Sequence, residues 1–333
     1  MKLRTERLKK IQMSVTRKFL KGHKDAVISL CNSDDRNVLF SASDDWTARM
    51  WDVREKHTAT RLFKIDGEGD VGFVHVSSDL LTVSRGSGLV GFDLRQSNSI
   101  IVSTPSFVYR GIEEEDINDF DIGSESILIP TDSGTVREID RRSFVEKSTS
   151  HTHGNIASVC RFLPSGDQFV SGGYDCRVCT GKLCGETKEY PVRSLIPIDE
   201  DEESSSRAQT VNPPFVTGLG VSPTRRDRLG ISLGDGSVLV MDIRRGGSKL
   251  DMRRPAWGGS SIHSSSVASL SWSSDGESIW SVGTDSVLVK MDEHCIRVRY
   301  SLEGYKPNSV AELEPQRVAV AGTVNEIEVI DFR

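Results

Sequence analysis

The sequence has little cysteine, little proline and no long hydrophobic run. Its 333 residues include only 6 Cys and 11 Pro, and the cysteines do not form the dense framework of a small secreted domain. We therefore expect a reduced, intracellular protein, either cytoplasmic or nuclear. No apolar stretch approaches the roughly 20 residues that a membrane-spanning helix needs, so a membrane partner is not expected.

An excess of positive charge is also missing. The chain carries 42 Lys and Arg against 48 Asp and Glu, which gives a formal net charge of −6. A protein that grips nucleic acid over a broad surface needs a basic face, so nucleic acid is not an expected general partner. The exception is the beginning of the chain, where we expect a basic N-terminal arm over residues 1–12.

What the sequence does contain is a repeated spacing. His23, Ser41 and Asp45 are separated by 18 and then 4 positions. The same two intervals recur in two later sets, His153, Ser171 and Asp175, and His263, Ser281 and Asp285. Short alternating stretches between turn residues lie among these positions, and such stretches predict strands rather than helices.

A second recurring feature is the pair Asp-x-Arg at the end of a predicted third strand. It occurs five times, at Asp52/Arg54, Asp93/Arg95, Asp140/Arg142, Asp242/Arg244 and Asp331/Arg333. The first three lie 41 and 47 residues apart, and the longer gaps of 102 and 89 residues each span two units. A period of about 40–45 residues with four strands is typical of a β-propeller blade. The sequence therefore predicts an all-β chain of seven blades.

Closure of the ring requires a fourth strand for the last blade. An isolated blade would leave apolar surface exposed, so blades pack side by side until the ring closes. The last unit reaches only its third strand at Arg333, whereas residues 13–20 precede the first unit and can supply the missing one. We expect a single propeller over residues 13–333, closed by this N-terminal latch strand, with an acidic surface insertion at about 197–210.

The first unit resembles the WD-repeat family, through Gly22-His23, Ser43-Asp44-Asp45 and Trp51-Asp52. The resemblance implies a hydrogen-bonded network of His, Ser, Asp and Trp that staples the strands of a blade. In this chain it would comprise His23, Ser41, Asp45 and Trp51 in the first blade, with shorter versions in the two later sets. The fourth and sixth units have Gly181 and Met291 at the Trp position, so weaker networks are expected there.

The resemblance also implies a function in binding other proteins. Some WD-repeat proteins are substrate receptors that dock on the DNA-damage-binding adaptor of cullin-4 ubiquitin ligases through a blade ending in Asp-x-Arg. Here the candidate docking residues are Asp52, Arg54, Asp93 and Arg95, because the first two blades are adjacent. We expect the other three copies to be spread around the ring. The simpler interpretation is that each Arg pairs with the Asp beside it.

The main alternative is a scaffold subunit in an RNA-processing or chromatin assembly, in which the basic arm contacts nucleic acid. An enzyme is not expected, because the recurring His, Ser and Asp mark architecture, whereas an active site is usually unique. A metal is not expected either, since Cys176, Cys179 and Cys184 lack a second pair at zinc-ligand spacing. We expect no cofactor and a chain that is monomeric by itself.

Overall fold

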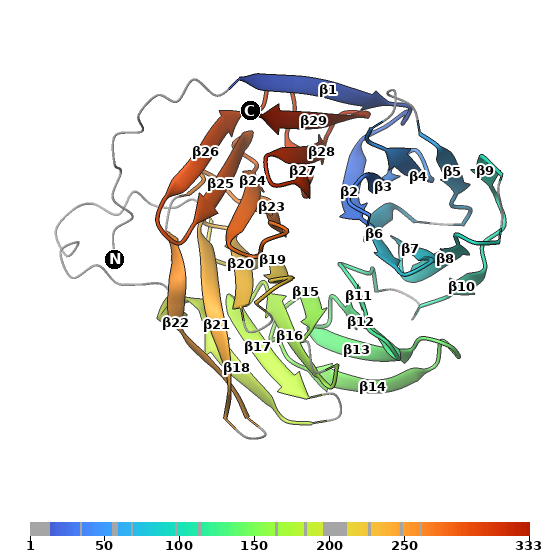
Figure 1. The fold of residues 1–333 in the computed structure, drawn as a ribbon. Helices are drawn as coiled ribbons and strands as arrows, with labels where there is room; N and C mark the ends of the chain where they lie inside the picture. Colours follow the sequence, from blue (N-terminus) through green and yellow to red (C-terminus); the bar gives the residue numbers. More distant parts are fainter. Residues whose placement is uncertain are drawn as a thin grey trace.

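Seven β-sheets arranged in a ring make up the molecule, as the computed structural model shows (Figure 1). Of residues 14–333, the structure leaves undescribed 34, 55–58, 68, 97–98, 112–114, 164–165, 183–184, 196–211, 226–227, 247–248 and 260–261, and the side chains of 244–259. The predicted basic arm (1–12) and acidic insertion (197–210) lie outside the described residues.

Within each blade the strands follow one another outward from the centre in sequence order, except that the outermost strand of blade 7 comes from the beginning of the chain (Figure 1). Blades 1 and 2 contain β2 (Val27–Asn32), β3 (Val38–Ser43), β4 (Thr47–Asp52), β5 (Arg61–Lys64) and β9 (Ile101–Val102), then β6 (Val71–Ser77), β7 (Leu80–Arg85), β8 (Gly88–Asp93) and β10 (Phe107–Tyr109). Blades 3 and 4 contain β11 (Asp121–Ile122), β12 (Ser126–Pro130), β13 (Thr135–Asp140) and β14 (Glu146–His151), then β15 (Ala157–Phe162), β16 (Gln168–Gly173), β17 (Arg177–Lys182) and β18 (Thr187–Pro191).

The second half of the ring follows the same plan. A short helix, α1 (Val192–Leu195), follows blade 4. Blades 5 and 6 contain β19 (Val216–Val221), β20 (Arg228–Leu233), β21 (Val238–Gly246) and β22 (Lys249–Gly259), then β23 (Val267–Trp272), β24 (Ser278–Gly283), β25 (Val287–Asp292) and β26 (Ile296–Ser301). Blade 7 contains β27 (Pro307–Glu314), β28 (Arg317–Gly322), β29 (Glu326–Phe332) and β1 (Val15–Lys21).

Burial along the strands explains why these segments pair in this order. Every residue of β24 is buried, because a middle strand has a neighbouring blade on each face. The outermost strand β26 instead alternates between half-buried and exposed residues, the period-2 pattern of a strand with one face in solvent. Small apolar clusters between adjacent blades, rather than one central core, therefore hold the ring together.

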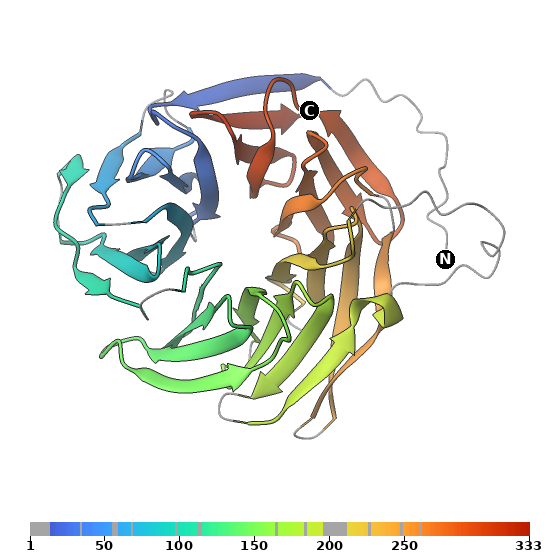
Figure 2. The same cartoon turned by 180° about the vertical axis from the view of Figure 1, so that it is seen from behind.

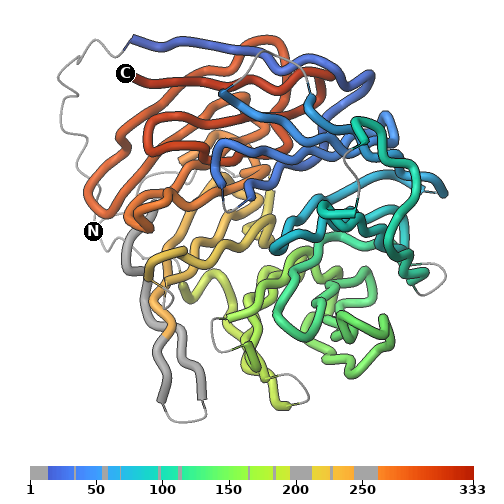
Figure 3. Tube along the Cα trace, turned by 45° about the vertical axis from the view of Figure 1, so that its right-hand side comes forward, coloured from blue at the N-terminus to red at the C-terminus, as the bar shows by residue number. Residues whose placement is uncertain are grey.

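The predicted latch is confirmed. Strand β1 pairs antiparallel with β29 along its whole length, from Val15 opposite Phe332 to Lys21 opposite Glu326. The first and last strands of the chain, β1 and β29, thus lie side by side (Figures 2 and 3). Arg17 of the latch also pairs with Glu328, which is 2% exposed, so the latch neutralises a buried carboxylate as well as covering a strand edge.

Two expectations about the ring are wrong. The Asp-x-Arg pair of blade 5 does not end a strand, because β21 continues to Gly246 and pairs onward with β22. The pair of blade 7 is not remote from blade 1, because closure makes these blades neighbours, and Arg36 of blade 1 bonds with Glu312 of blade 7 at 2.9 Å. Blades 7, 1 and 2 are therefore consecutive.

One strand was not expected at all. Blade 1 has a fifth strand, β9, which pairs in parallel with β5. The chain returns from blade 2 to the rim of blade 1, where the Leu62 N–H donates to the Ile100 carbonyl at 2.7 Å. The edge of β5 is therefore covered by a segment that lies almost 40 residues later in the chain.

Candidate interaction sites

The repeated His, Ser and Asp of blade 1 meet in a buried hydrogen-bonded network. His23 Nδ1 lies 3.0 Å from Asp45 Oδ2, and His23 Nε2 lies 2.7 Å from Ser41 Oγ. The indole Nε1–H of Trp51 donates to the same Ser41 Oγ at 2.8 Å. With the Nδ1 proton on His23 shared with Asp45, every polar atom of this network has a partner.

Blades 4 and 6 contain the same contacts without the indole. His153 Nδ1 and Nε2 lie 3.0 Å from Asp175 and 3.0 Å from Ser171. The corresponding distances from His263 are 3.1 Å to Asp285 and 2.9 Å to Ser281. Gly181 and Met291 stand where blade 1 has its Trp, opposite Phe169 and Ile279.

Burial and hydrogen bonding shift the ionisation of these groups in different directions. Burial lowers the pKa of His23, and its bond with Asp45 only partly offsets this effect. Burial alone would raise the pKa of the Asp45 carboxyl, but hydrogen bonds from His23 and Thr47 outweigh it and hold this pKa well below its usual range. The network is thus a neutral imidazole beside a carboxylate.

On the opposite face of the disc, Asp52 and Arg54 form a two-pronged ion pair. Arg54 donates from Nε to Asp52 Oδ1 at 3.0 Å and from Nη2 to Oδ2 at 2.7 Å. The Val53 N–H between them donates to the carbonyl of Asn37. Arg317 and Lys18, both in blade 7, donate to the Val53 carbonyl at 2.8 and 3.2 Å. This turn is therefore fixed to its own blade and to the neighbouring one.

Asp93 and Arg95 repeat this arrangement in blade 2. The Nε and Nη2 atoms of Arg95 donate to Asp93 at 3.0 and 2.9 Å, and Leu94 N–H donates to the Asp79 carbonyl. Hydrogen bonds from Arg95 lower the pKa of the Asp93 carboxyl to about 2. Since blades 1 and 2 share one strand order and direction, both pairs lie on the same face of the disc.

The remaining Asp-x-Arg copies differ. Arg333 of blade 7 binds Asp331 through Nε and Nη2 at 3.0 and 2.8 Å. In blade 3, by contrast, Lys147 pairs with Asp140 at 3.1 Å, and Arg142 turns to Glu125 at 3.8 Å. An Asp–Arg pair joined through Nε and Nη2 thus occurs in the consecutive blades 7, 1 and 2, although in blade 7 both nitrogens donate to one oxygen, Asp331 Oδ2. The sequence prediction placed blade 7 apart from blades 1 and 2, although closure of the ring already implied that it lies beside blade 1.

A cavity of about 400 Å³ lies at the centre of the disc, where the first strands of blades 1–6 end. Its charged wall carries Arg36, His75, Asp121 and Arg161, and its other wall is largely apolar, with Leu219 and Trp272 among the lining residues. Arg161 pairs with Asp119, and His75 Nε2 lies 3.4 Å from Asp121. Arg36 pairs with Glu312 at 2.9 Å, whereas His75 Nδ1 is buried without a hydrogen-bond partner among the described residues.

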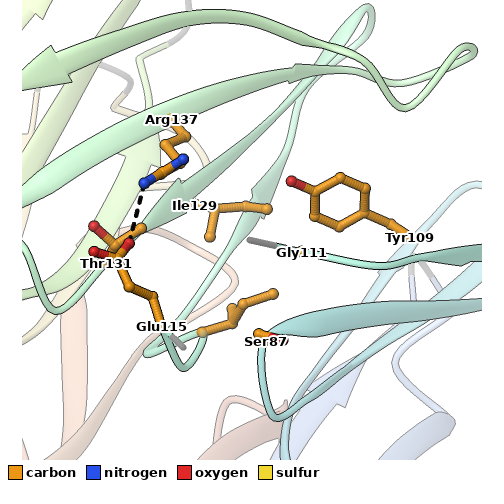
Figure 4. A pocket seen from close by; sticks show the side chains of 8 residues that line it. Ser87, Tyr109, Gly111, Glu115, Ile129, Thr131 and Arg137 are labelled. Carbon is orange, nitrogen blue, oxygen red and sulfur yellow. Dashed lines mark hydrogen bonds and ion pairs between the residues drawn. The ribbon is translucent and has the colours of Figure 1, made fainter. Parts of the chain in front are cut away.

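A much smaller cavity lies between blades 2 and 3 (Figure 4). Tyr109, Gly111 and Ile129 line it, beside the ion pair of Arg137 with Glu115 at 3.1 Å. Its volume of about 20 Å³ is comparable to the space that one water molecule needs. We assign no ligand to it.

The described ranges contain neither a metal-binding cluster nor a membrane-spanning helix. No group of three or more His, Cys, Asp or Glu there is arranged to hold a metal ion. Cys176 and Cys179 are free thiols, whereas Cys184 lies outside the described residues. No described helix has the length and apolar character that crossing a membrane requires.

Comparison with known proteins agrees with this geometry. The family model "WD domain, G-beta repeat" matches residues 14–52 and 143–180, which contain the His–Ser–Asp sets of blades 1 and 4. A solved structure, the WD40 β-propeller domain of Doa1, superimposes with a TM-score of 0.71 over 94% of this chain and 95% of that one, at 17% identity. This chain is a seven-bladed β-propeller that contains WD repeats.

Two proteins with different names are similar to this chain in sequence. The WD repeat-containing protein 53 homolog of Dictyostelium discoideum is 27% identical over 67% of this chain and 63% of its own length. Periodic tryptophan protein 1 of Saccharomyces cerevisiae is 31% identical over 47% of this chain and 29% of its own length. The matches thus span less than two thirds of each of these relatives.

Proposed function

We propose that the propeller is a non-catalytic protein-interaction module that serves as a substrate receptor of a cullin-4 ubiquitin ligase. In this proposal it docks on the DNA-damage-binding adaptor through Asp52/Arg54 and Asp93/Arg95. The observation that carries it is the repetition of one exposed Asp–Arg geometry in two adjacent blades on one face. The resemblance to WD-repeat proteins that dock through Asp-x-Arg supplies the identity of the partner.

The geometry suits a docking role because each Arg is held in one conformation yet remains accessible. The side chains of Arg54 and Arg95 are 59% and 70% exposed. A two-pronged pair with a carboxylate fixes the plane of the guanidinium, so less conformational freedom is lost when a partner binds.

The same pairs have a structural interpretation, which makes a different prediction. Exposed ion pairs stabilise proteins by only about 0–1 kcal/mol. If the pairs merely stabilise strand ends, replacing both arginines will slightly lower the free energy of unfolding and change nothing else. If they form a docking surface, the same change will abolish binding while the fold remains.

The test is capture of the adaptor by the full-length chain and by the Arg54→Ala/Arg95→Ala variant. We expect wild type to retain the adaptor and the double variant to lose it, with circular dichroism showing that the variant is folded. Arg142→Ala is the matched control, since Arg142 belongs to an Asp-x-Arg sequence but does not bind Asp140 through its guanidinium, and it should retain the adaptor.

Two results would overturn the proposal. One is a wild-type protein that does not capture the adaptor, and the other is a folded double variant that captures it fully. Nuclease treatment of the capture distinguishes the alternative, a scaffold in an RNA-processing or chromatin assembly, whose partners would be lost together with the nucleic acid.

A further inference from the structure

The most exposed aromatic side chain of the described surface is Trp46, with 58% of its area in solvent. It lies in the turn between β3 and β4, on the face opposite the Asp-x-Arg pairs. Its backbone has a φ of 63°, a left-handed conformation that bulky residues rarely adopt. A Trp in such a position is not explained by packing within the blade.

The Trp46 ring is held from one side by Arg85 of blade 2. The Arg85 guanidinium lies 5.2 Å from the ring centroid, and the residue is only 5% exposed. Arg85 itself is fixed by hydrogen bonds to the carbonyls of Ile65, Gly67 and Gly69. One side of the indole therefore rests on a rigid cation.

The flanking residues of the turn are equally fixed. Asp45, which precedes Trp46, accepts hydrogen bonds from the backbone of Lys24 at 2.9 Å and from His23 in the stapling network. Asp45 also accepts from Thr47, which follows Trp46, at 3.0 Å from the N–H and 2.6 Å from the hydroxyl. The aromatic group is thus presented from a preorganised turn, which lowers the entropic cost of binding.

Three carboxylates lie in the loops beside this turn: the Asp44 N–H donates to the carbonyl of Ala26, next to Asp25, and the Asp70 carbonyl accepts the N–H of Gly86, next to Arg85. Asp25, Asp44 and Asp70 are all exposed, and none of them forms an ion pair with another described residue. Burial raises the pKa of the Asp44 carboxyl, and the charges of Asp25 and Asp70 raise it further, so both of these carboxylates lie within electrostatic reach of Asp44. Lys24 in the adjacent loop and Arg85 against the ring offset part of this negative charge.

We propose that Trp46, together with Asp25, Asp44 and Asp70, binds a Lys- or Arg-rich segment of a partner protein. One cation of the segment lies on the open face of the indole, where it is attracted by the ring quadrupole. The carboxylates attract the remaining positive charges and steer the encounter. Trp is enriched among the few residues that contribute most of the binding free energy in protein interfaces.

This surface does not depend on what binds the opposite face. Trp46 precedes β4, and Asp52 ends it, so the two features lie at opposite ends of one strand. A protein docked at Arg54 would leave Trp46 accessible.

The test uses a short fluorescently labelled oligo-arginine peptide, with an oligo-glutamate peptide as the charge control, and measures binding by anisotropy. The informative variant is Trp46→Gly, because Gly adopts a positive φ without strain, so loss of the ring need not lower the thermal midpoint. We expect Trp46→Gly to weaken oligo-arginine binding about tenfold, as removal of one cation–π contact implies. Asp44→Asn/Asp70→Asn should weaken it and reduce its salt dependence.

The matched control is Tyr174→Ala, because Tyr174 is a 45% exposed aromatic residue in the equivalent turn of blade 4. The Tyr174→Ala variant and the Arg54→Ala/Arg95→Ala variant should both bind oligo-arginine with the affinity of wild type. The proposal is overturned if wild type does not bind oligo-arginine, if Trp46→Gly binds it as tightly as wild type, or if Tyr174→Ala weakens binding as much as Trp46→Gly.

Discussion

Replacing one serine in each of two blades would measure what the stapling network contributes. Ser41 and Ser171 are both fully buried, at 0% exposure, and each bonds with a His Nε2. They differ in one partner, because Ser41 Oγ also accepts the indole N–H of Trp51, whereas blade 4 has Gly181 in that position. Ser41→Ala therefore leaves two buried polar groups without a partner, and Ser171→Ala leaves one.

The expected magnitudes follow from this difference. A buried polar group that loses its hydrogen-bond partner destabilises the folded state by about 1–3 kcal/mol. Ser41→Ala should thus lower the free energy of unfolding by about 1–3 kcal/mol more than Ser171→Ala does. Neither change creates a large cavity, since only one oxygen is removed, so the comparison isolates the hydrogen bonds.

Urea denaturation followed by circular dichroism measures both variants beside wild type, and the midpoints are compared at equal slope. A double-mutant cycle with Trp51→Phe adds a second check. In the Trp51→Phe protein, Ser41→Ala should lower the free energy of unfolding no more than Ser171→Ala lowers that of wild type. The reasoning is refuted if Ser171→Ala lowers the free energy of unfolding as much as Ser41→Ala does, or more. The hydrogen bond from the Trp51 indole would then contribute nothing to stability.

Two further predictions concern closure and pH. Deletion of residues 1–20 should give aggregated protein, because it removes most of β1, opens the edge of β29 and leaves Glu328 without Arg17, whereas deletion of residues 1–10 should be tolerated. A stable monomer from the longer deletion, judged by size-exclusion chromatography, would contradict the latch. Burial lowers the pKa of His23 and of the His in the other two networks. Below about pH 6.5 the unfolded chain therefore binds more protons than the folded chain, and the free energy of unfolding should decrease as the pH drops further. If the urea midpoint does not decrease when the pH is lowered from about 7.5 to 5.5, these imidazoles are not held neutral.

The sequence predicted the parts of the fold that repeat. The 18- and 4-residue intervals of His23, Ser41 and Asp45 recur because each blade places these residues at fixed strand positions, so their register could be inferred without coordinates. The latch was predictable because the last blade lacked one strand. Strand β9 was not, because its parallel pairing with β5 depends on a return of the chain that no local pattern signals.

Contacts across the closed ring were equally beyond the sequence. Arg36 and Glu312 are 276 positions apart, and neither belongs to a repeated motif. Glu312 is fully buried and also accepts the Ser274 N–H at 2.6 Å, so it joins blades 6, 7 and 1. The buried carboxylate is tolerated because charged and polar donors surround it, an arrangement that only the closed ring creates.

The two proposed surfaces are connected through the stapling network of blade 1. Strand β4 has six residues, from Thr47 to Asp52, and at about 3.3 Å per residue it separates its two ends by roughly 20 Å. Trp51 lies near one end of this strand, and its indole bonds through Ser41 and His23 to Asp45 at the other. A strand fixed at both ends holds Trp46 and Arg54 at a constant separation and in constant orientations. Under the proposed receptor function, this rigidity would determine where on the disc the second protein is held relative to the first.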